Sequence, residues 1–290
     1  MGDLFAIIAP VFVCTALGWA WVRAGRSYDR ELITVLISDI GAPCLVFSRL
    51  VALEVEPEAM AEMAVAAGIS VAAFAVAGIA ILRLARLPLN TFLCPIVFGN
   101  QGNMGLPVCL FAFGEEGLAL AIAYFSVTAT LQFTAGIAIW SGRLSLRELA
   151  RTPLIHAVVL AVAVLASGTT VPAWIWNTTE ILGGFAIPLM LVTLGASLAE
   201  LRVARIGRSV VLACCRLGIG FGVGMALAAL LDLSGVARGV LVLQCSMPAA
   251  VFNYLFAQRY ARAPEEVASI VVVSTLLAFA GLPFLLGFLM

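Results

Sequence analysis

The chain is short of charge and contains no lysine. All 16 of its basic residues are arginine, and 16 acidic residues bring the formal net charge to zero. Charged residues make up 11% of the 290 positions, against roughly 25% in a typical soluble domain. This balance excludes a basic surface for nucleic acid.

Polar surface is scarce in general, because 63% of the residues are hydrophobic and the mean hydropathy is +1.13. A water-soluble fold of this length would need many more polar residues to cover itself. The lipid bilayer is the solvent that suits such a composition. We therefore expect an all-α integral membrane protein in contact with lipid.

Residues that form metal and catalytic sites are also rare. There is one histidine, and the seven cysteines form no C-x-x-C pair. Zinc and redox sites need such clusters. No H-E-x-x-H motif and no serine–histidine constellation is present. The sequence therefore predicts no metal site, no cofactor and no enzymatic activity.

Long apolar runs fill most of the chain. Cutting them at charged or Pro/Gly-rich breaks predicts about ten membrane-spanning helices, most of about 19–24 residues, the length that spans hydrocarbon. The predicted helices lie near 4–22, 32–50, 62–82, 92–113, 117–140, 152–171, 181–200, 209–231, 236–258 and 267–289.

The arginines fall in every second loop between these helices. Thirteen of the 16 lie there, namely Arg23, Arg26, Arg30, Arg83, Arg86, Arg143, Arg147, Arg151, Arg202, Arg205, Arg208, Arg259 and Arg262. Positive loops mark the cytoplasmic side, so both termini are predicted to lie outside. The arginine-only loops and the many alanines and valines favour a bacterium of high genomic GC, and hence its inner membrane.

The two halves of the chain resemble each other weakly. Gly41-Ala42-Pro43 in the second helix corresponds to Ala186-Ile187-Pro188 in the seventh, and Gly105-Leu106-Pro107 in the fourth corresponds to Ser246-Met247-Pro248 in the ninth. Five helices separate each pair, so the second half is inverted. Inverted repeats with interrupted helices are a transporter design. We predict a first five-helix repeat over 1–142 and a second over 152–290.

Two segments place glycines, amides and proline in the middle of apolar spans. They cover residues 98–107 and 244–253, and both helices should be broken there, which is tolerated only where the backbone lines a cavity or is buried in protein. The free N–H groups of two half-helices would suit a carboxylate. Amides in membrane helices also serve simply to hold helices together. The predicted substrate-binding residues are Asn100, Gln101, Asn103, Pro107, Gln244, Ser246, Pro248 and Asn253.

A few other polar residues at membrane depth are candidates for ion or proton coupling. They are Asp39, Thr130, Ser274 and Thr275. The hydroxyls have an alternative role, a hydrogen bond to the backbone one turn back. Asp39 lies at a depth similar to that of Arg216. Two readings stay open: the two residues pair, or Arg216 extends to the surface while Asp39 faces a hydrated crevice.

The fourth, ninth and tenth helices carry the motifs of a known family. Asn100, Gly102, Gly105 and Pro107 fit an Asn-x-Gly-x-x-Gly-x-Pro pattern. Pro248 is followed by Asn253, and the Ser274-Thr275 pair is followed by Pro283. Over essentially its whole length the chain resembles the auxin efflux carrier (AEC) family, within a superfamily that includes the bile-acid sodium symporters.

The resemblance implies two inverted five-helix repeats, with a scaffold of helices 1, 2, 6 and 7 and a transport core of helices 3–5 and 8–10. The broken helices 4 and 9 would cross at Pro107 and Pro248. It also implies elevator-type transport of an organic anion: auxin in plants, and small carboxylates such as malonate or malate in some bacterial carriers. The long hydrophilic loop of many plant members is absent here, which weakens auxin as the substrate.

Other readings remain beside this one. A sodium-coupled symporter of the bile-acid type is one, with sodium or a proton as the coupling ion. A membrane receptor that binds an organic anion without moving it belongs to another class. A homodimer through the scaffold helices is a further expectation of the family resemblance.

Overall fold

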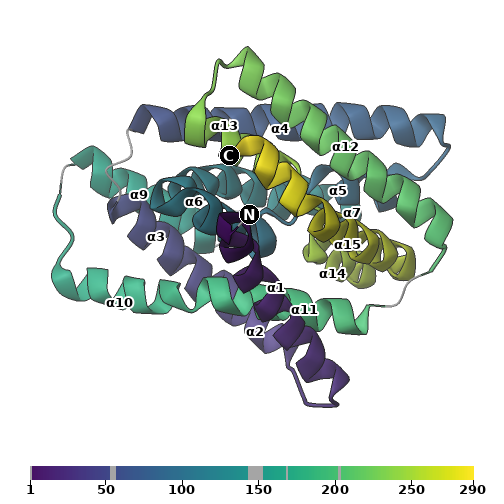
Figure 1. Ribbon diagram of the computed structural model, residues 1–290, viewed down its shortest axis with the longest axis horizontal. Coiled ribbons are helices and arrows are strands. Elements are labelled where there is room, and N and C mark those ends of the chain that lie inside the picture. Colours follow the sequence, from purple (N-terminus) through teal and green to yellow (C-terminus); the bar gives the residue numbers. More distant parts are fainter. Residues whose placement is uncertain (1, 53–56, 143–152, 168, 202–203) are drawn as a thin grey trace.

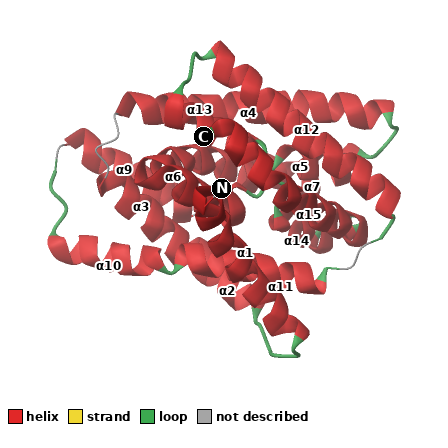
Figure 2. Cartoon of the chain, viewed as in Figure 1, coloured by secondary structure: helices red, strands yellow, loops and turns green. Residues whose placement is uncertain are grey.

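The computed structural model describes residues 2–52, 57–142, 153–167, 169–201 and 204–290, and within these the regular structure is helical (Figures 1 and 2). The predicted arginine loop at 143–151 and Arg202 lie outside the described residues. In chain order the α-helices are α1 (Gly2–Arg23), α2 (Arg30–Leu36), α3 (Ala42–Ala52), α4 (Pro57–Leu84), α5 (Leu89–Val97), α6 (Leu106–Leu131), α7 (Ile137–Ser141), α9 (Pro153–Ser167), α10 (Ala173–Gly184), α11 (Ala186–Glu200), α12 (Ile206–Leu230), α13 (Gly235–Cys245), α14 (Val251–Arg259) and α15 (Pro264–Leu289).

Three π-helical turns join some of these helices into longer rods. They are η1 (Ile37–Gly41), η2 (Gln101–Gly105) and η3 (Gln132–Gly136). Each of them ends on a glycine. A π-helical turn inserts an extra residue into the helical hydrogen-bond ladder, and such turns are frequent at functional sites.

Seven helices of the described ranges are long and apolar enough to cross a membrane. One of them, Gln101–Ser141, has 41 residues, and a straight helix of that length would be about 60 Å long, twice the thickness of the hydrocarbon core. Its backbone leaves the helical conformation at Gly114, with φ 68° and ψ −157°, next to the boundary predicted between two spans. Shorter apolar helices, α9 and α13, cover the predicted spans 152–171 and 236–258 only in part.

The outer surface of the helices is apolar. Large side chains with most of their area exposed include Phe5, Leu84, Trp174, Ile181 and Phe284. Water would not favour such a surface, whereas hydrocarbon does. The all-helical, apolar architecture is that of an integral membrane protein, as the sequence predicted.

The helices pack in two groups. In one group α1 lies along α11, and α3 packs against α9 and α10. In the other, α4 packs on α5 and α6, α13 on α6, and α12 on α13 and α15. Figure 1 shows α10 and α11 along one side of the molecule and α4 and α12 along the opposite side.

Small residues allow α1 and α11 to approach closely. A Cβ atom at Gly18 would clash with the backbone carbonyl of Val192, and one at Gly195 would clash with the carbonyl of Thr15. Membrane helices use glycine in this way because lipid provides no hydrophobic force between helices, and close backbone packing replaces it.

Candidate functional site

Two broken helices cross at the centre of the molecule. The chain is extended between α5 and η2 and between α13 and α14, and Gly99 pairs with Ala249 in an antiparallel bridge. The N–H of Asn100 donates to the carbonyl of Pro248 at 2.6 Å, and the N–H of Ala250 donates to the carbonyl of Phe98 at 3.1 Å. These reciprocal bonds satisfy backbone groups that lipid would leave unpaired.

Side chains brace the crossing from two sides. The Nδ2 atom of Asn253 donates to the carbonyl of Phe98 at 3.0 Å. The N–H of Ala249 donates to the hydroxyl of Ser274 at 3.1 Å. Both side chains are fully buried. The crossing is therefore held rigidly by α14 and α15.

A central cavity of about 260 Å³ lies on one side of the crossing. All three π-helical turns contribute to its wall, η1 through Asp39, η2 through Asn103 and η3 through Gln132. Its full lining is Ile37, Ser38, Asp39, Ala42, Gly99, Asn100, Gly102, Asn103, Phe125, Gln132, Phe133, Pro153, Leu154, Met190, Ala250 and Phe252. The size suits a small organic molecule, with apolar walls and a few polar groups to orient it.

Two amides in this lining have free donors. The side chains of Asn100 and Gln132 are 4% and 7% exposed. Neither Asn100 Nδ2 nor Gln132 Nε2 has a hydrogen-bond partner among the described residues. A buried donor without a partner is costly. A ligand that accepts hydrogen bonds would satisfy both of them.

Helix N-termini add to this donor character. The chain becomes helical again at Gln101 after one break and at Val251 after the other. Asn100 and Ala250, which precede these starts, both line the central cavity. The open N–H groups and the positive end of a helix dipole favour an anion at such a position.

The predicted substrate residues are distributed unevenly around the crossing. Asn100 and Asn103 line the central cavity. Six others lie outside its wall, namely Gln101, Pro107, Gln244, Ser246, Pro248 and Asn253. Of these, Pro248 and Asn253 shape the crossing through the bonds given above. Ser246 donates to the carbonyl of Val242 at 2.7 Å and lines a separate, smaller cavity.

The expectation that the helices cross at Pro107 is wrong. The crossing on that side lies at Phe98–Asn100, and Pro107 lies in the first turn of α6. The helical turn η2 precedes α6 directly, so the helix that begins at Gln101 runs through Pro107 and is not broken there. Pro248, by contrast, does lie at the crossing.

The coupling candidates also divide. Thr130 donates to the carbonyl of Ser126, and Ser274 and Thr275 both donate to the carbonyl of Val271. These are the backbone bonds that the sequence allowed as the alternative. Asp39 differs from them, because it is the one titratable side chain among the described residues that line the central cavity.

Asp39 and Arg216 do not pair. Within the described ranges the three guanidinium nitrogens of Arg216 have no hydrogen-bond partner. The alternative that Arg216 extends to the surface is also wrong, because its side chain is 0% exposed. Asp39 does face a cavity, as that alternative predicted.

Gln132 is a polar residue of the cavity wall that the sequence does not single out. It follows a run of hydroxyl residues in the fifth predicted helix, and a lone amide there offers little signal. Its place in the wall depends on η3, which shifts the helical register at Gln132–Gly136. A shared pattern was available in the sequence, since all three π-helical turns combine polar residues with a closing glycine.

A second cavity of about 380 Å³ adjoins the first and shares Ile37, Asn103 and Phe252 with it. Arg30 lines it, and the Nη2 atom of Arg30 lies 2.6 Å from the carboxylate of Glu200. Its remaining lining residues are Glu31, Thr34, Val35, Thr193, Ser197, Val251, Leu255 and Gln258. The shared residues place the two cavities side by side, with the second one at the start of α2.

Tyr28 closes the margin of this second cavity. Its hydroxyl lies 2.8 Å from that of Thr193, which is part of the cavity wall. Burial raises the pKa of the Tyr28 phenol, so the side chain stays neutral at physiological pH. It fixes the loop before α2 against α11.

Comparison with known proteins agrees with this architecture. A family model described as a membrane transport protein matches residues 3–144 and 139–286. An uncharacterized transporter of Methanocaldococcus jannaschii is 26% identical over 206 residues, 67% of this chain and 67% of that protein.

A second uncharacterized transporter, from Methanothermobacter thermautotrophicus, is 30% identical over 193 residues, and the match spans 63% of each chain. Neither name states a substrate. Because the family model covers nearly the whole sequence, the chain belongs to the membrane transport protein family, the auxin efflux carrier family that its motifs resemble.

Proposed function

We propose that the protein is a secondary transporter of small organic anions, with carboxylates such as malonate or malate as the substrate class. The anion binds in the central cavity against the crossing of the two broken helices. The observation that carries this proposal is the pair of buried, unsatisfied donors, Asn100 Nδ2 and Gln132 Nε2, on the wall of one cavity.

A carboxylate matches this wall chemically. Its two oxygens accept several hydrogen bonds, and the helix starts at Gln101 and Val251 favour negative charge. The aromatic rings of Phe125, Phe133 and Phe252 offer apolar contact to the carbon skeleton. A small cavity of this kind selects short acids over bulky ones.

Transport follows an elevator-type mechanism in this proposal. The helices that pack around the crossing, from α4 to α7 and from α12 to α15, move as one core and carry the cavity against a scaffold of the other helices. The two packing groups support such a division. The protein resides in the bacterial inner membrane with both termini outside, and its scaffold helices form a homodimer.

Uptake of labelled malonate into proteoliposomes tests the proposal. Asn100→Ala and Gln132→Ala should each raise the KM for uptake because each removes a donor from the cavity wall. Asn177→Ala is the matched control, since it removes an exposed amide of α10, away from both cavities. Equal KM values in all three variants would remove the central cavity from the proposal.

The same vesicles separate the competing functions. A receptor would bind malonate with the same dependence on Asn100 and yet accumulate none inside. A sodium-coupled symporter would need a sodium gradient for uptake. Transport without sodium, lost on substitution of the amides, is the expected outcome.

A further inference from the structure

Arg216 is the most unusual residue of the fold. It lies in the middle of α12 and is completely buried. Its guanidinium carbon lies 4.7 Å from the centre of the Phe74 ring. No nitrogen of the group meets a hydrogen-bond acceptor in the part of the chain that the structure describes. A guanidinium stays charged in proteins, so a full positive charge is held here without a paired carboxylate.

The charge lies directly behind the crossing. A Cβ atom added to Gly99 would clash with the Nη2 atom of Arg216, and that same Cβ position is 3.1 Å from the carbonyl oxygen of Met247. Gly99 is the residue that pairs with Ala249 in the antiparallel bridge. Glycine at position 99 therefore leaves room for the guanidinium against the backbone of the broken segments.

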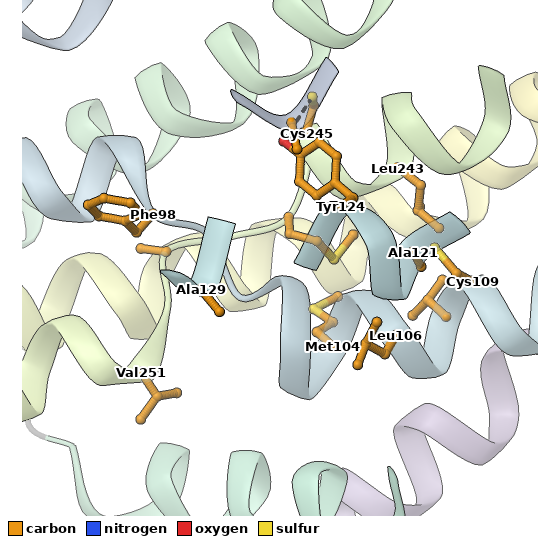
Figure 3. Packing of buried hydrophobic residues seen from close by; sticks show 14 of the residues in the cluster. Phe98, Met104, Leu106, Cys109, Ala121, Tyr124, Ala129, Leu243, Cys245 and Val251 are labelled. Carbon is orange, nitrogen blue, oxygen red and sulfur yellow. Dashed lines mark hydrogen bonds between the residues drawn. The ribbon is translucent and has the colours of Figure 1, made fainter. Parts of the chain in front are cut away.

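Polar neighbours of the guanidinium carry no formal charge. Tyr124 and Cys245 are buried on facing helices, and Figure 3 shows them side by side. The hydroxyl of Tyr124 is 2.6 Å from that of Ser70 and 3.4 Å from the sulfur of Cys245. This chain of contacts packs the region around Arg216 but contains no anion to neutralise it.

Backbone dipoles provide the negative charge instead. Helix α5 ends at Val97 and helix α13 ends at Cys245, so both end at the crossing. The C-terminal end of a helix carries about half a negative charge. Two such ends therefore amount to roughly one negative charge. Unwound carbonyls and half-helix C-termini are where ion-coupled transporters bind their cation.

We propose that Arg216 is a resident cation that occupies the position of a coupling metal ion behind the crossing. This inference rests on the proposed transport function and deepens it, because it excludes sodium as the coupling ion. The guanidinium offsets the two C-terminal helix ends on one face of the crossing, while the anionic substrate meets the two N-terminal starts on the other. A covalently fixed cation cannot dissociate, so it cannot couple transport to an ion gradient.

The first test measures sodium dependence in the wild-type protein. Thermal unfolding of the purified protein in detergent needs no substrate, and the melting temperature should be the same in sodium and in choline chloride. Malonate uptake should likewise not respond to sodium. Sodium-dependent stabilisation or uptake would overturn the proposal. If malonate is not transported at all, the unfolding experiment still decides the question, so the two failures are distinguishable.

The second test removes the charge and returns it as a small molecule. Arg216→Ala should lower the melting temperature, and millimolar methylguanidinium should restore much of the loss by filling the vacated space. Arg49→Ala is the matched control, because that arginine is partly exposed and paired with Glu115; methylguanidinium should not affect it. An equal response of both variants would contradict a specific cation position.

A pair of long side chains covers the case in which Arg216→Ala does not fold. Arg216→Lys keeps the charge, and Arg216→Met keeps most of the length without it. We expect the lysine variant to remain folded and independent of sodium, and the methionine variant to be much less stable. A methionine variant as stable and as active as the lysine variant would overturn the role of the charge.

Discussion

Asn253 joins the two halves of the molecule, since its Nδ2 atom donates to the carbonyl of Phe98, 155 residues earlier in the chain. The same carbonyl accepts the N–H of Ala250. One asparagine thus secures the end of α5 to the start of α14. The crossing depends on a side chain as well as on its two backbone bonds.

Asn253→Ala is expected to destabilise the crossing rather than to weaken substrate binding directly. Losing a buried hydrogen bond costs about 1–3 kcal/mol. The melting temperature in detergent should fall, with Asn177→Ala unchanged as the exposed control. The maximal rate of transport should fall, while the KM stays near the wild-type value. A raised KM with an unchanged melting temperature would instead make Asn253 a direct ligand.

Gly195 gives a second prediction, for the contact between α1 and α11. A Cβ at position 195 would clash with the backbone carbonyl of Thr15, and backbone cannot yield as a side chain can. Overpacking of this kind typically costs about 1–3 kcal/mol, so Gly195→Ala should lower the melting temperature.

Gly222→Ala is the control for that substitution. Gly222 is helical and exposed, with no atom near its Cβ position within the described parts of the chain. Alanine there should be neutral or stabilise the helix by up to about 1 kcal/mol. Destabilisation of equal size at both positions would rule out the close contact as the cause.

The sequence predicted the crossing because the cost of breaking a helix in lipid is visible in residue types. Asn100 and Pro248 each lie in a short stretch of glycines, amides or proline within an otherwise apolar run. The residue at which each helix breaks is harder to predict from the sequence. Pro107 is the predicted crossing point, yet the helix from Gln101 to Ser141 continues through it. A proline therefore indicates the region of the break but not the residue at which the break occurs.

The cavity wall was harder to predict than the crossing. Gln132 and Asp39 reach it because π-helical turns alter the register of their helices. Hydrophobic periodicity does not report such turns, although each of the three combines polar residues with a closing glycine. Arg216 is recognisable in the sequence as an ionisable residue in a span. Its position behind Gly99 is visible only in the tertiary structure.

Arg30 gives the third prediction, since it lines the second cavity, which adjoins the central one. Its Nη1 atom is buried and has no hydrogen-bond partner in the described ranges, while Nη2 pairs with Glu200. Arg30→Gln should raise the KM for an anion about tenfold, since a hydrogen bond to a charged group contributes about 1.5–3 kcal/mol.

Glu200→Gln separates the two contacts of Arg30. If Arg30 attracts the substrate, releasing it from Glu200 should leave the KM unchanged or lower it. If Arg30 only holds α2 against α11, Glu200→Gln should reproduce the defect of Arg30→Gln. Initial uptake rates at varied malonate concentration distinguish the two results.

Asp39 gives the last prediction, because it places a carboxyl group in a cavity that otherwise favours anions. A bound carboxylate and an ionised Asp39 would repel each other in a medium of low dielectric constant. Replacing Asp39 by asparagine removes this repulsion and keeps the size of the side chain. Asp39→Asn should therefore lower the KM for malonate uptake relative to wild type.

Asp232→Asn is the matched control: it makes the same change in a loop residue with a φ of 51°, a conformation that asparagine also tolerates. Initial uptake rates at varied malonate concentration should give a lower KM for Asp39→Asn and a wild-type KM for Asp232→Asn. A wild-type KM for Asp39→Asn would mean that the carboxyl group of Asp39 does not face the bound anion.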